Sequence, residues 1–407
     1  NTAHVRFVLR EVVWLGVILL YCYLNEFRPW FAQSEKHYSR DVFLFLTGVL
    51  LVAAVFTVRK SRDAGTLFSR DNSGEFRGWM QFLFVLYHYT NAREAYNAIR
   101  VFVSAYVWMT GFGNFSYFYL KDDFSAVRLV KMLWRLNFLV LLLMATMGTD
   151  YILYYIVPLH TFYFLLVWAT MHVRRDVNRS EYGVRVKVFV AAALIWLVWD
   201  ALGGTSVFDA LFAWAFFLRD ASGSLHEWHF RTFIDHYSTL FGMVFALNFP
   251  YVAAWLRRTE RLAWPRRVAV KAAVAGVCVA AAVWWYRNVY VLDKYAFNAR
   301  HSYTMWIPIT TYVLLRNLTP TLRSYHSGLL QWLGNITLET YLLQHHALLI
   351  SNHGTYWKPV SLHTLVPHYP YVNMLVVTAV FVYCSHRTFS ITLTLRDALI
   401  PERAAAI

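Results

Sequence analysis

The stretch "GWMQFLFVLYHYTN", Gly78 to Asn91, decides the class of this protein. It is largely apolar and aromatic, yet it places one histidine, His88, deep inside the run. An ionisable side chain in hydrocarbon costs about 2.5–3.5 kcal/mol on insertion scales, so such a residue is a functional candidate when it faces protein or a water-filled cavity. The stretch therefore predicts a membrane-spanning helix that carries a chemically useful group.

The composition of the whole chain is that of a membrane protein. Of its 407 residues 58% are hydrophobic and only 15% are charged, whereas soluble domains have roughly 25% charged residues. The net charge is +15, but the basic residues form short clusters between apolar runs, which excludes the pattern of a nucleic-acid binder. The three cysteines lie inside apolar runs at spacings that suit neither zinc nor a disulfide framework, so we expect no metal.

Apolar runs along the chain predict an all-α polytopic membrane protein with about twelve transmembrane helices. Basic loops follow every second run, as expected for cytosolic loops, so both termini are predicted to be cytosolic. Val207–Leu218 is too short for an ordinary crossing and is predicted to be re-entrant or interfacial. We expect one integral membrane domain over residues 1–407, with N-terminal helices in 9–58 and a core in 76–401. The predicted runs are 9–24, 42–58, 76–91, 97–120, 130–148, 151–173, 187–201, 237–256, 268–287, 303–316, 328–350 and 371–386.

A second group of polar residues lies in the run 328–350, "GLLQWLGNITLETYLLQHHALLI". Asn335, Glu339 and His346 follow an i, i+4, i+11 spacing, which predicts a polar stripe on one face of a helix, with His345 beside it. Glu339 and His346 are consistent with a buried structural pair, with a proton relay of a transporter, or with part of an active site.

The two polar groups are predicted to lie at similar depth. His88 is 11 residues beyond Arg77, which marks the cytosolic start of its run, so it lies roughly 16 Å along the helix axis. Glu339 lies roughly 16 Å along the axis from Gly328. A carboxylate and two or three imidazoles can therefore converge within the bundle.

Basic side chains also recur at helical spacing. Arg128, Lys131 and Arg135 form a cationic stripe on the predicted cytosolic side, where it is either a topology anchor or a docking site for an anionic cytosolic cofactor. Arg100 lies near the predicted lumenal end of its run.

Several long blocks closely resemble the membrane domain shared by three eukaryotic groups. These are the plant reduced-wall-acetylation proteins, the fungal capsule polysaccharide O-acetylation proteins and the animal sialic acid O-acetyltransferase. The resemblance runs from about residue 10 to residue 401 and is nearest to the plant type. The blocks that carry it are "GWMQFLFVLYHYTNAREAYNAIRVFVSAYVWMTGFGNFSYFYLKDDFS", "MLWRLNFLV", "DYILYYIVPLHT", "LHEWHFRTFIDHY", "HSYTMWIPITTYVLLRN" and "WLGNITLETYLLQHH".

A fainter resemblance links the chain to bacterial membrane acyltransferases of family three. Those proteins have an Arg and then a His in an early helix, which "RGWMQFLFVLYH" matches with Arg77 and His88. The resemblance implies that His88 is the catalytic centre. It also matches a late histidine to His345 in "LGNITLETYLLQH", although helical phase favours His346.

The family resemblance implies an acetyl-CoA-dependent O-acetyltransferase of polysaccharides or glycans in the Golgi membrane. Acetyl groups would pass from cytosolic acetyl-CoA to lumenal acceptors. The fungal and animal relatives carry a lumenal hydrolase-like domain, whereas only "NEFRPWFAQSEKHYSRD" separates the first two runs here. The residue that makes the final transfer is therefore left open, and a separate lumenal acetyltransferase is a possible partner besides membrane lipids and the glycan. The alternative function is a carrier of acetyl groups or acetyl-CoA that feeds such an enzyme.

On the donor side, the resemblance implies that CoA phosphates bind cations at the cytosolic ends of two runs. Arginine pairs with phosphate through two parallel hydrogen bonds. The predicted set is Arg77, Arg128, Lys131 and Arg135.

On the chemical side, a neutral His88 would act as a general base towards the acceptor hydroxyl, or as a nucleophile that forms an acetyl-imidazole. Glu339 or Tyr87 is expected to orient its ring, as a carboxylate orients histidine in hydrolytic triads. Arg100 is expected to stabilise the thioester oxyanion.

Overall fold

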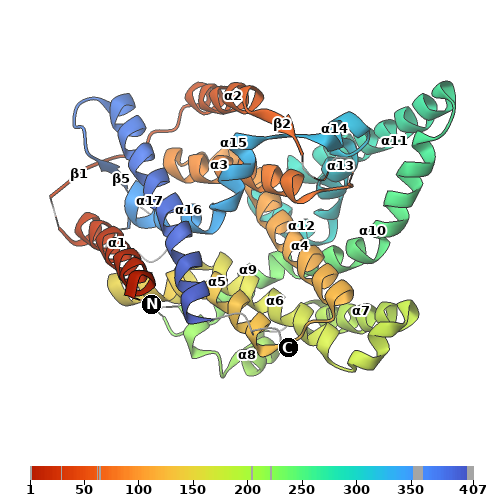
Figure 1. The fold of residues 1–407 in the computed structure, drawn as a ribbon, viewed down its shortest axis with the longest axis horizontal. Coiled ribbons are helices and arrows are strands. Elements are labelled where there is room, and N and C mark those ends of the chain that lie inside the picture. The colour runs from red at the N-terminus through yellow and green to blue at the C-terminus, as the bar shows by residue number, and fades with distance from the viewer. Residues whose placement is uncertain are drawn as a thin grey trace.

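The structure is a computed structural model that describes residues 2–28, 30–61, 63, 66–202, 205–220, 222–351 and 361–400. Part of the predicted lumenal loop after residue 351 and the predicted C-terminal end therefore lie outside the described residues. The described chain is a bundle of helices with two small sheets, in which the first and last helices run side by side (Figure 1). The described chain is mostly helical, as predicted, and the two small sheets are an addition to the predicted all-α class.

Most predicted apolar runs coincide with one long helix each. Six helical segments in the described chain are long and apolar enough to cross a membrane. The helix that contains residues 78–90 is not one of these six, because it begins earlier than predicted and includes a polar first half. The helices of 16 residues or more are α1 (Thr2–Phe27), α2 (Arg40–Phe56), α3 (Arg70–Thr90), α4 (Tyr96–Lys121), α5 (Ala126–Met147), α6 (Ile156–His172), α7 (Glu181–Trp196), α10 (Ser238–Glu260), α11 (Trp264–Trp285) and α17 (Pro370–Leu399).

Shorter helices connect and interrupt the long ones. The segment predicted to be re-entrant or interfacial forms a helix of eight residues and a 3₁₀ turn, and its relation to the membrane stays a prediction. The short α-helices are α8 (Thr205–Phe212), α9 (His226–Asp235), α12 (Lys294–Thr304), α13 (Trp306–Arg316), α14 (Pro320–Ser324), α15 (Gly328–Asn335) and α16 (Thr337–Leu343). The 3₁₀ and π segments are η1 (Arg93–Ala95), η2 (Tyr151–Tyr154), η3 (Arg175–Arg179), η4 (Leu197–Ala201), η5 (Phe216–Leu218), η6 (Tyr286–Tyr290) and η7 (Gln344–Leu348).

The run 328–350 is not the continuous helix that the sequence predicts. Asn335 ends α15, Ile336 separates α15 from α16, and a π-helical turn, η7, follows at Gln344. Each break rotates the residues after it relative to an ideal helix. The predicted polar stripe is therefore wrong, and Asn335 is exposed whereas Glu339 is buried.

Two antiparallel sheets tie loops together that the charge pattern assigns to the same side. In one sheet β1 (Ala32–Ser34) pairs with β5 (Ser361–Thr364), which also pairs with β4 (Leu349–Ile350). In the other, β2 (Val58–Lys60) pairs with β3 (Tyr325–Ser327). The first sheet joins loops predicted to be lumenal, and the second joins loops predicted to be cytosolic. These contacts agree with the predicted alternation of loops, while the absolute orientation stays a prediction.

The crossing of α3 and α15 places the candidate site. A Cβ atom on Gly78 would lie 1.8 Å from the carbonyl oxygen of Leu330, and one on Gly334 would lie 2.0 Å from that of Gly74. Small residues four apart are typical of closely packed membrane helices, because they allow backbones to touch. This contact fixes α3, which carries both Arg77 and His88, against the segment that leads to His345.

Candidate active site

Two histidines from distant parts of the chain meet inside the bundle. The ring centroids of His88 in α3 and His345 in η7 lie 6.3 Å apart. The His88 ring also contacts Phe84 at 4.7 Å and Tyr87 at 5.0 Å. His345 is only 6% exposed, and neither of its ring nitrogens has a hydrogen-bond partner among the described residues. Buried polar atoms without partners are rare, so this pair is a candidate site for a polar ligand or water.

The π turn decides which of the two adjacent histidines faces His88. Helical phase favoured His346, but η7 directs His345 towards His88 instead. The His346 ring binds elsewhere, because its Nε2 lies 2.6 Å from the Tyr154 hydroxyl and its Nδ1 lies 3.3 Å from a Glu26 carboxylate oxygen. The preference for His346 as the neighbour of His88 is therefore corrected.

Glu339 does not contact the His88 imidazole that it was expected to orient. Its carboxylate accepts two hydrogen bonds from the Arg135 guanidinium, one of them 3.1 Å long. Glu339 is fully buried, and a buried carboxylate requires such a partner because desolvation of its charge is costly. Of the two residues expected to orient His88, only Tyr87 lies beside the ring.

The remaining predicted cations lie on α3 (Arg77) and on α5 (Arg128 and Lys131), the helix that also carries Arg135. Arg128 lies over the ring of Tyr117, 4.0 Å from its centroid. The Arg77 side chain is largely buried, and its Nε has no hydrogen-bond partner among the described atoms. Lys131 is half-buried on α5 and also interacts with other residues. The Glu339 carboxylate already balances the charge of Arg135, and a role of the other cations in binding an anion stays a prediction.

Arg100 belongs to a separate buried network. Its guanidinium lies 3.1 Å from a carboxylate oxygen of Asp235, which also accepts a hydrogen bond from Ser104. The Ser104 oxygen lies 2.6 Å from Nε2 of His301. The Arg100 guanidinium is thus held by Asp235, and its charge also acts on Tyr87, which lies beside His88. The expected oxyanion role of Arg100 stays a prediction.

Different charged residues act on His88 and on Arg77, which lie towards opposite ends of α3. His88 experiences the charges of Lys36, which follows β1, and of Arg231 in α9. Both lie in segments predicted to be lumenal. Arg77 instead experiences the charge of Arg135, near the predicted cytosolic end of α5. The single helix α3 thus carries Arg77 towards the predicted cytosolic side and His88 towards the predicted lumenal side.

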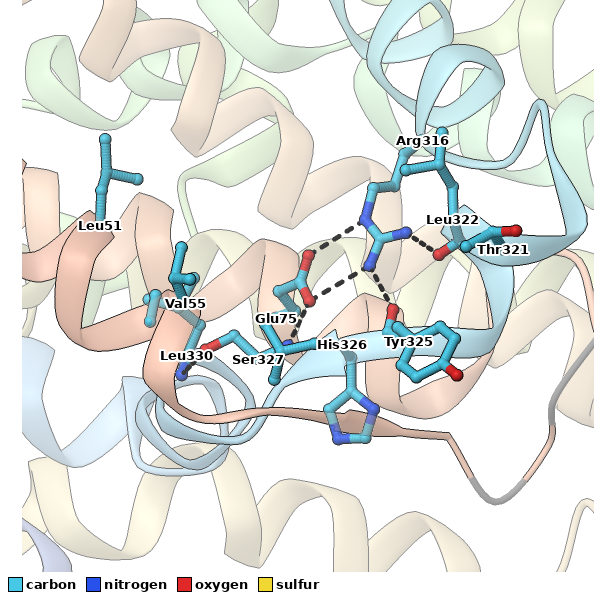
Figure 2. Close-up of a pocket in the computed structure, with 12 residues that line it drawn as sticks. Leu51, Val55, Glu75, Arg316, Thr321, Leu322, Tyr325, His326, Ser327 and Leu330 are labelled. Carbon is cyan, nitrogen blue, oxygen red and sulfur yellow. Dashed lines mark hydrogen bonds and ion pairs between the residues drawn. The ribbon is translucent and has the colours of Figure 1, made fainter.

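A cavity of about 500 Å³ lies on the predicted cytosolic side, between α2, α3 and the segment from α14 to α15. Figure 2 shows Arg316 bridging Glu75 and backbone carbonyls on its wall. Glu75 accepts two bonds from Arg316, of 3.0 and 3.2 Å. Because its charges are already paired and it does not include His88, this cavity is not assigned to the acetyl-transfer site.

Two residues that lie around the histidines, Glu26 and Tyr154, could not be identified as candidates from the sequence pattern. Glu26 stands at the end of an apolar run, where a charge is ordinary, and Tyr154 is one of 27 tyrosines. No spacing rule links either residue to His346, which is far away in the chain. Among the described residues, no group of three or more His, Cys, Asp or Glu side chains could hold a metal ion.

Comparisons with known proteins give the family context. Residues 1–407 match the model of the 10 TM acyl transferase domain found in Cas1p. The chain is 29% identical over 406 residues to a Danio rerio protein named N-acetylneuraminate (7)9-O-acetyltransferase, and the match covers 97% of this chain and 51% of that protein. The chain thus spans about half the length of this curated relative. No solved structure matches. The family description has ten crossings, so the predicted count of about twelve is not confirmed.

Proposed function

This chain belongs to the family of the 10 TM acyl transferase domain found in Cas1p, and we propose that it is an acetyl-CoA-dependent O-acetyltransferase of glycans or polysaccharides. In this proposal acetyl groups pass from cytosolic acetyl-CoA to acceptors in the Golgi lumen. The name of the zebrafish relative supports O-acetylation of a sugar. A separate lumenal acetyltransferase is a further proposed partner, which would receive the acetyl group in place of a direct acceptor.

The apposition of His88 and His345 is the observation that carries this proposal. An unsatisfied buried polar group costs about 1–3 kcal/mol, so the two unpartnered ring nitrogens of His345 favour a site for a polar ligand over simple helix packing. A reacting pair requires such free nitrogens, because they must exchange protons with the substrate.

The donor is proposed to enter from the cationic end of α3. Arg77, Arg128 and Lys131 would bind the CoA phosphates, with Arg135 held in place by Glu339. Arg77 and His88 are separated by 11 residues, or roughly 16 Å of helix, a distance that the extended pantetheine arm can span. The acetyl thioester would then reach the histidine pair while the charged part of CoA stays outside the bundle.

The transfer itself exchanges one bond for another. The acceptor hydroxyl oxygen attacks the acetyl carbonyl carbon, so that a C–O bond forms and the C–S bond breaks. His88 takes the hydroxyl proton as a general base and returns it to the leaving CoA thiolate. In the alternative route, a neutral His88 attacks first and an acetyl-imidazole carries the group to the acceptor.

The test uses purified protein in nanodiscs with acetyl-labelled acetyl-CoA. Sialic acid and a neutral cell-wall oligosaccharide serve as acceptors in separate reactions. Wild-type protein should label an acceptor or itself, and His88→Ala should lower the rate about 10²–10⁴-fold, the usual contribution of a general base. His160→Ala is the matched control, because this other bundle histidine binds Thr110 and is not part of the pair.

The same purified protein, reconstituted into sealed vesicles, separates the enzyme from the carrier. If wild-type vesicles accumulate intact acetyl-CoA while no acetyl group reaches an acceptor or the chain, the carrier function is correct and the transferase is not. A covalent acetyl group on His88, trapped by rapid acid quenching, would select the nucleophilic route over general-base catalysis.

A further inference from the structure

A carboxylate, an imidazole and a phenol form a continuous buried chain next to the histidine pair. The Glu26 carboxylate lies 3.3 Å from Nδ1 of His346, and the Tyr154 hydroxyl lies 2.6 Å from Nε2 of the same ring. His346 and Tyr154 are both fully buried. The Tyr154 ring also contacts His345, with 5.8 Å between centroids, so the chain ends against the residue that faces His88.

Three hydrogen bonds join the end of α1 to the π turn η7 and to Ser351, which follows it. Asn25 donates its side-chain amide to the backbone carbonyl of His346 at 3.1 Å. Glu26 contacts the His346 ring and accepts a hydrogen bond from the backbone N–H of Ser351 at 3.3 Å. These bonds fix the side chain of His346, its backbone carbonyl and the backbone N–H of Ser351. The conformation of η7 therefore depends on a helix more than 300 residues away in the chain.

The chemistry of the groups fixes the direction of the hydrogen bonds. An ionised carboxylate only accepts, so Glu26 requires a proton on Nδ1 of His346. In the tautomer that carries its proton on Nδ1, Nε2 of His346 then accepts from the Tyr154 hydroxyl. Thr149, whose hydroxyl lies 3.1 Å from the Tyr154 oxygen, can donate to that oxygen in turn. The arrangement selects one tautomer and one rotamer of His346, in the way that outer partners orient a working histidine.

We propose that Glu26 and Tyr154 are positioning residues for acetyl transfer, which act through His346 to hold His345 against His88. This inference rests on the proposed function and assigns a role to α1, which the sequence analysis counted outside the acyltransferase core. Neither residue needs to touch the acetyl group. Loss of either would let η7 relax towards a regular helix, and a displacement of about 1 Å costs about 10²-fold in rate.

The test compares three variants in the acetyl-transfer assay. Tyr154→Phe removes one oxygen atom and should lower kcat about 10²-fold with an unchanged KM for acetyl-CoA. Glu26→Leu should have a similar effect. Glu26→Gln should recover most of the lost activity, because its amide oxygen still accepts from Nδ1 and from the Ser351 N–H. A purely structural role would instead lower the unfolding temperature and leave kcat per folded molecule unchanged.

Glu11→Gln is the matched control, since Glu11 is a second buried glutamate of α1 whose partner is Arg387 at 2.8 Å. It should change stability but not kcat. If Glu26→Leu does not fold, Tyr154→Phe alone decides the question. An active wild type whose Tyr154→Phe variant keeps its full kcat overturns the positioning role, whereas an inactive wild type contradicts the proposed function instead.

Discussion

Arg135 of α5 and Glu339 of α16 are joined by two hydrogen bonds across 204 positions of sequence. The two partners are not equally buried, because the Arg135 side chain is 24% exposed and that of Glu339 is 0% exposed. Arg135 also lies over the ring of Phe389 in α17. One ion pair thus connects three helices next to the proposed donor path.

Removal of the arginine should destabilise the protein more than removal of the glutamate. Arg135→Leu leaves an uncompensated carboxylate in the bundle and should lower the free energy of unfolding by about 3–5 kcal/mol. Glu339→Leu should cost less, because the Arg135 guanidinium can still reach solvent. Denaturant or thermal unfolding in detergent measures both values.

The double variant Arg135→Leu/Glu339→Leu is the control for this ion pair. It removes both charges and should recover part of the loss caused by Arg135→Leu. If the two single losses simply add, the residues do not interact as the structure shows.

The close crossing of α3 and α15 predicts that even one added methyl group at Gly78 disrupts packing. Gly78→Ala should prevent correct packing, because the new methyl group would lie 1.8 Å from the Leu330 carbonyl oxygen. Gly113→Ala in α4 is the matched control, since no atom lies within 4 Å of its added Cβ. The control should be stabilised by up to about 1 kcal/mol through helix propensity. The yield of monodisperse protein and its unfolding temperature report both effects, and equal behaviour of the two variants would contradict the crossing.

The separation of His88 from Arg77 along the helix axis could be predicted from the sequence because one helix, α3, contains both residues and helical rise is constant. The partner of His88 could not be predicted in the same way. Periodicity ranked His346 above His345 on the assumption of an unbroken helix, and the break at Ile336 and the π turn invalidate that assumption. No propensity scale marks such a turn, which follows from tertiary contacts.

The ion pairs could not be predicted from the sequence for a different reason. The cationic stripe on α5 was visible as a pattern, but nothing in the spacing indicates that Glu339 would bind Arg135 rather than orient His88. Contacts between separate helices depend on how the helices pack, and a single sequence contains no signal for such pairs. Asp235, the partner of Arg100, was missed for the same reason.

Acid should weaken one connection between two loops predicted to be lumenal. The Arg40 guanidinium and then the Tyr38 hydroxyl bind the Glu94 carboxylate and lower its pKa to about 2. Because this pKa lies below the usual value of about 4.3, the stabilisation is complete above about pH 4.3 and is lost as the pH falls towards 2. Hydrogen–deuterium exchange at the N-terminal end of α2, corrected for its intrinsic pH dependence, should rise in that range.

Glu94→Gln tests the same connection at neutral pH. It should raise exchange at the start of α2 at pH 7 and abolish the further increase in acid. Exchange in the middle of α4 serves as the internal control. An unchanged profile in the variant would show that another group controls the order of α2.

The two sheets provide a test of membrane orientation. Lys60→Cys and Tyr325→Cys lie opposite each other in β2 and β3, and Gln33→Cys lies in β1. In cells whose plasma membrane alone is permeabilised, a membrane-impermeant maleimide should label the first two variants, and Gln33→Cys only after detergent. The three native cysteines are buried and should react slowly. Labelling of Gln33→Cys alone would invert the orientation, whereas opposite behaviour of the Lys60 and Tyr325 variants would contradict the pairing of β2 with β3.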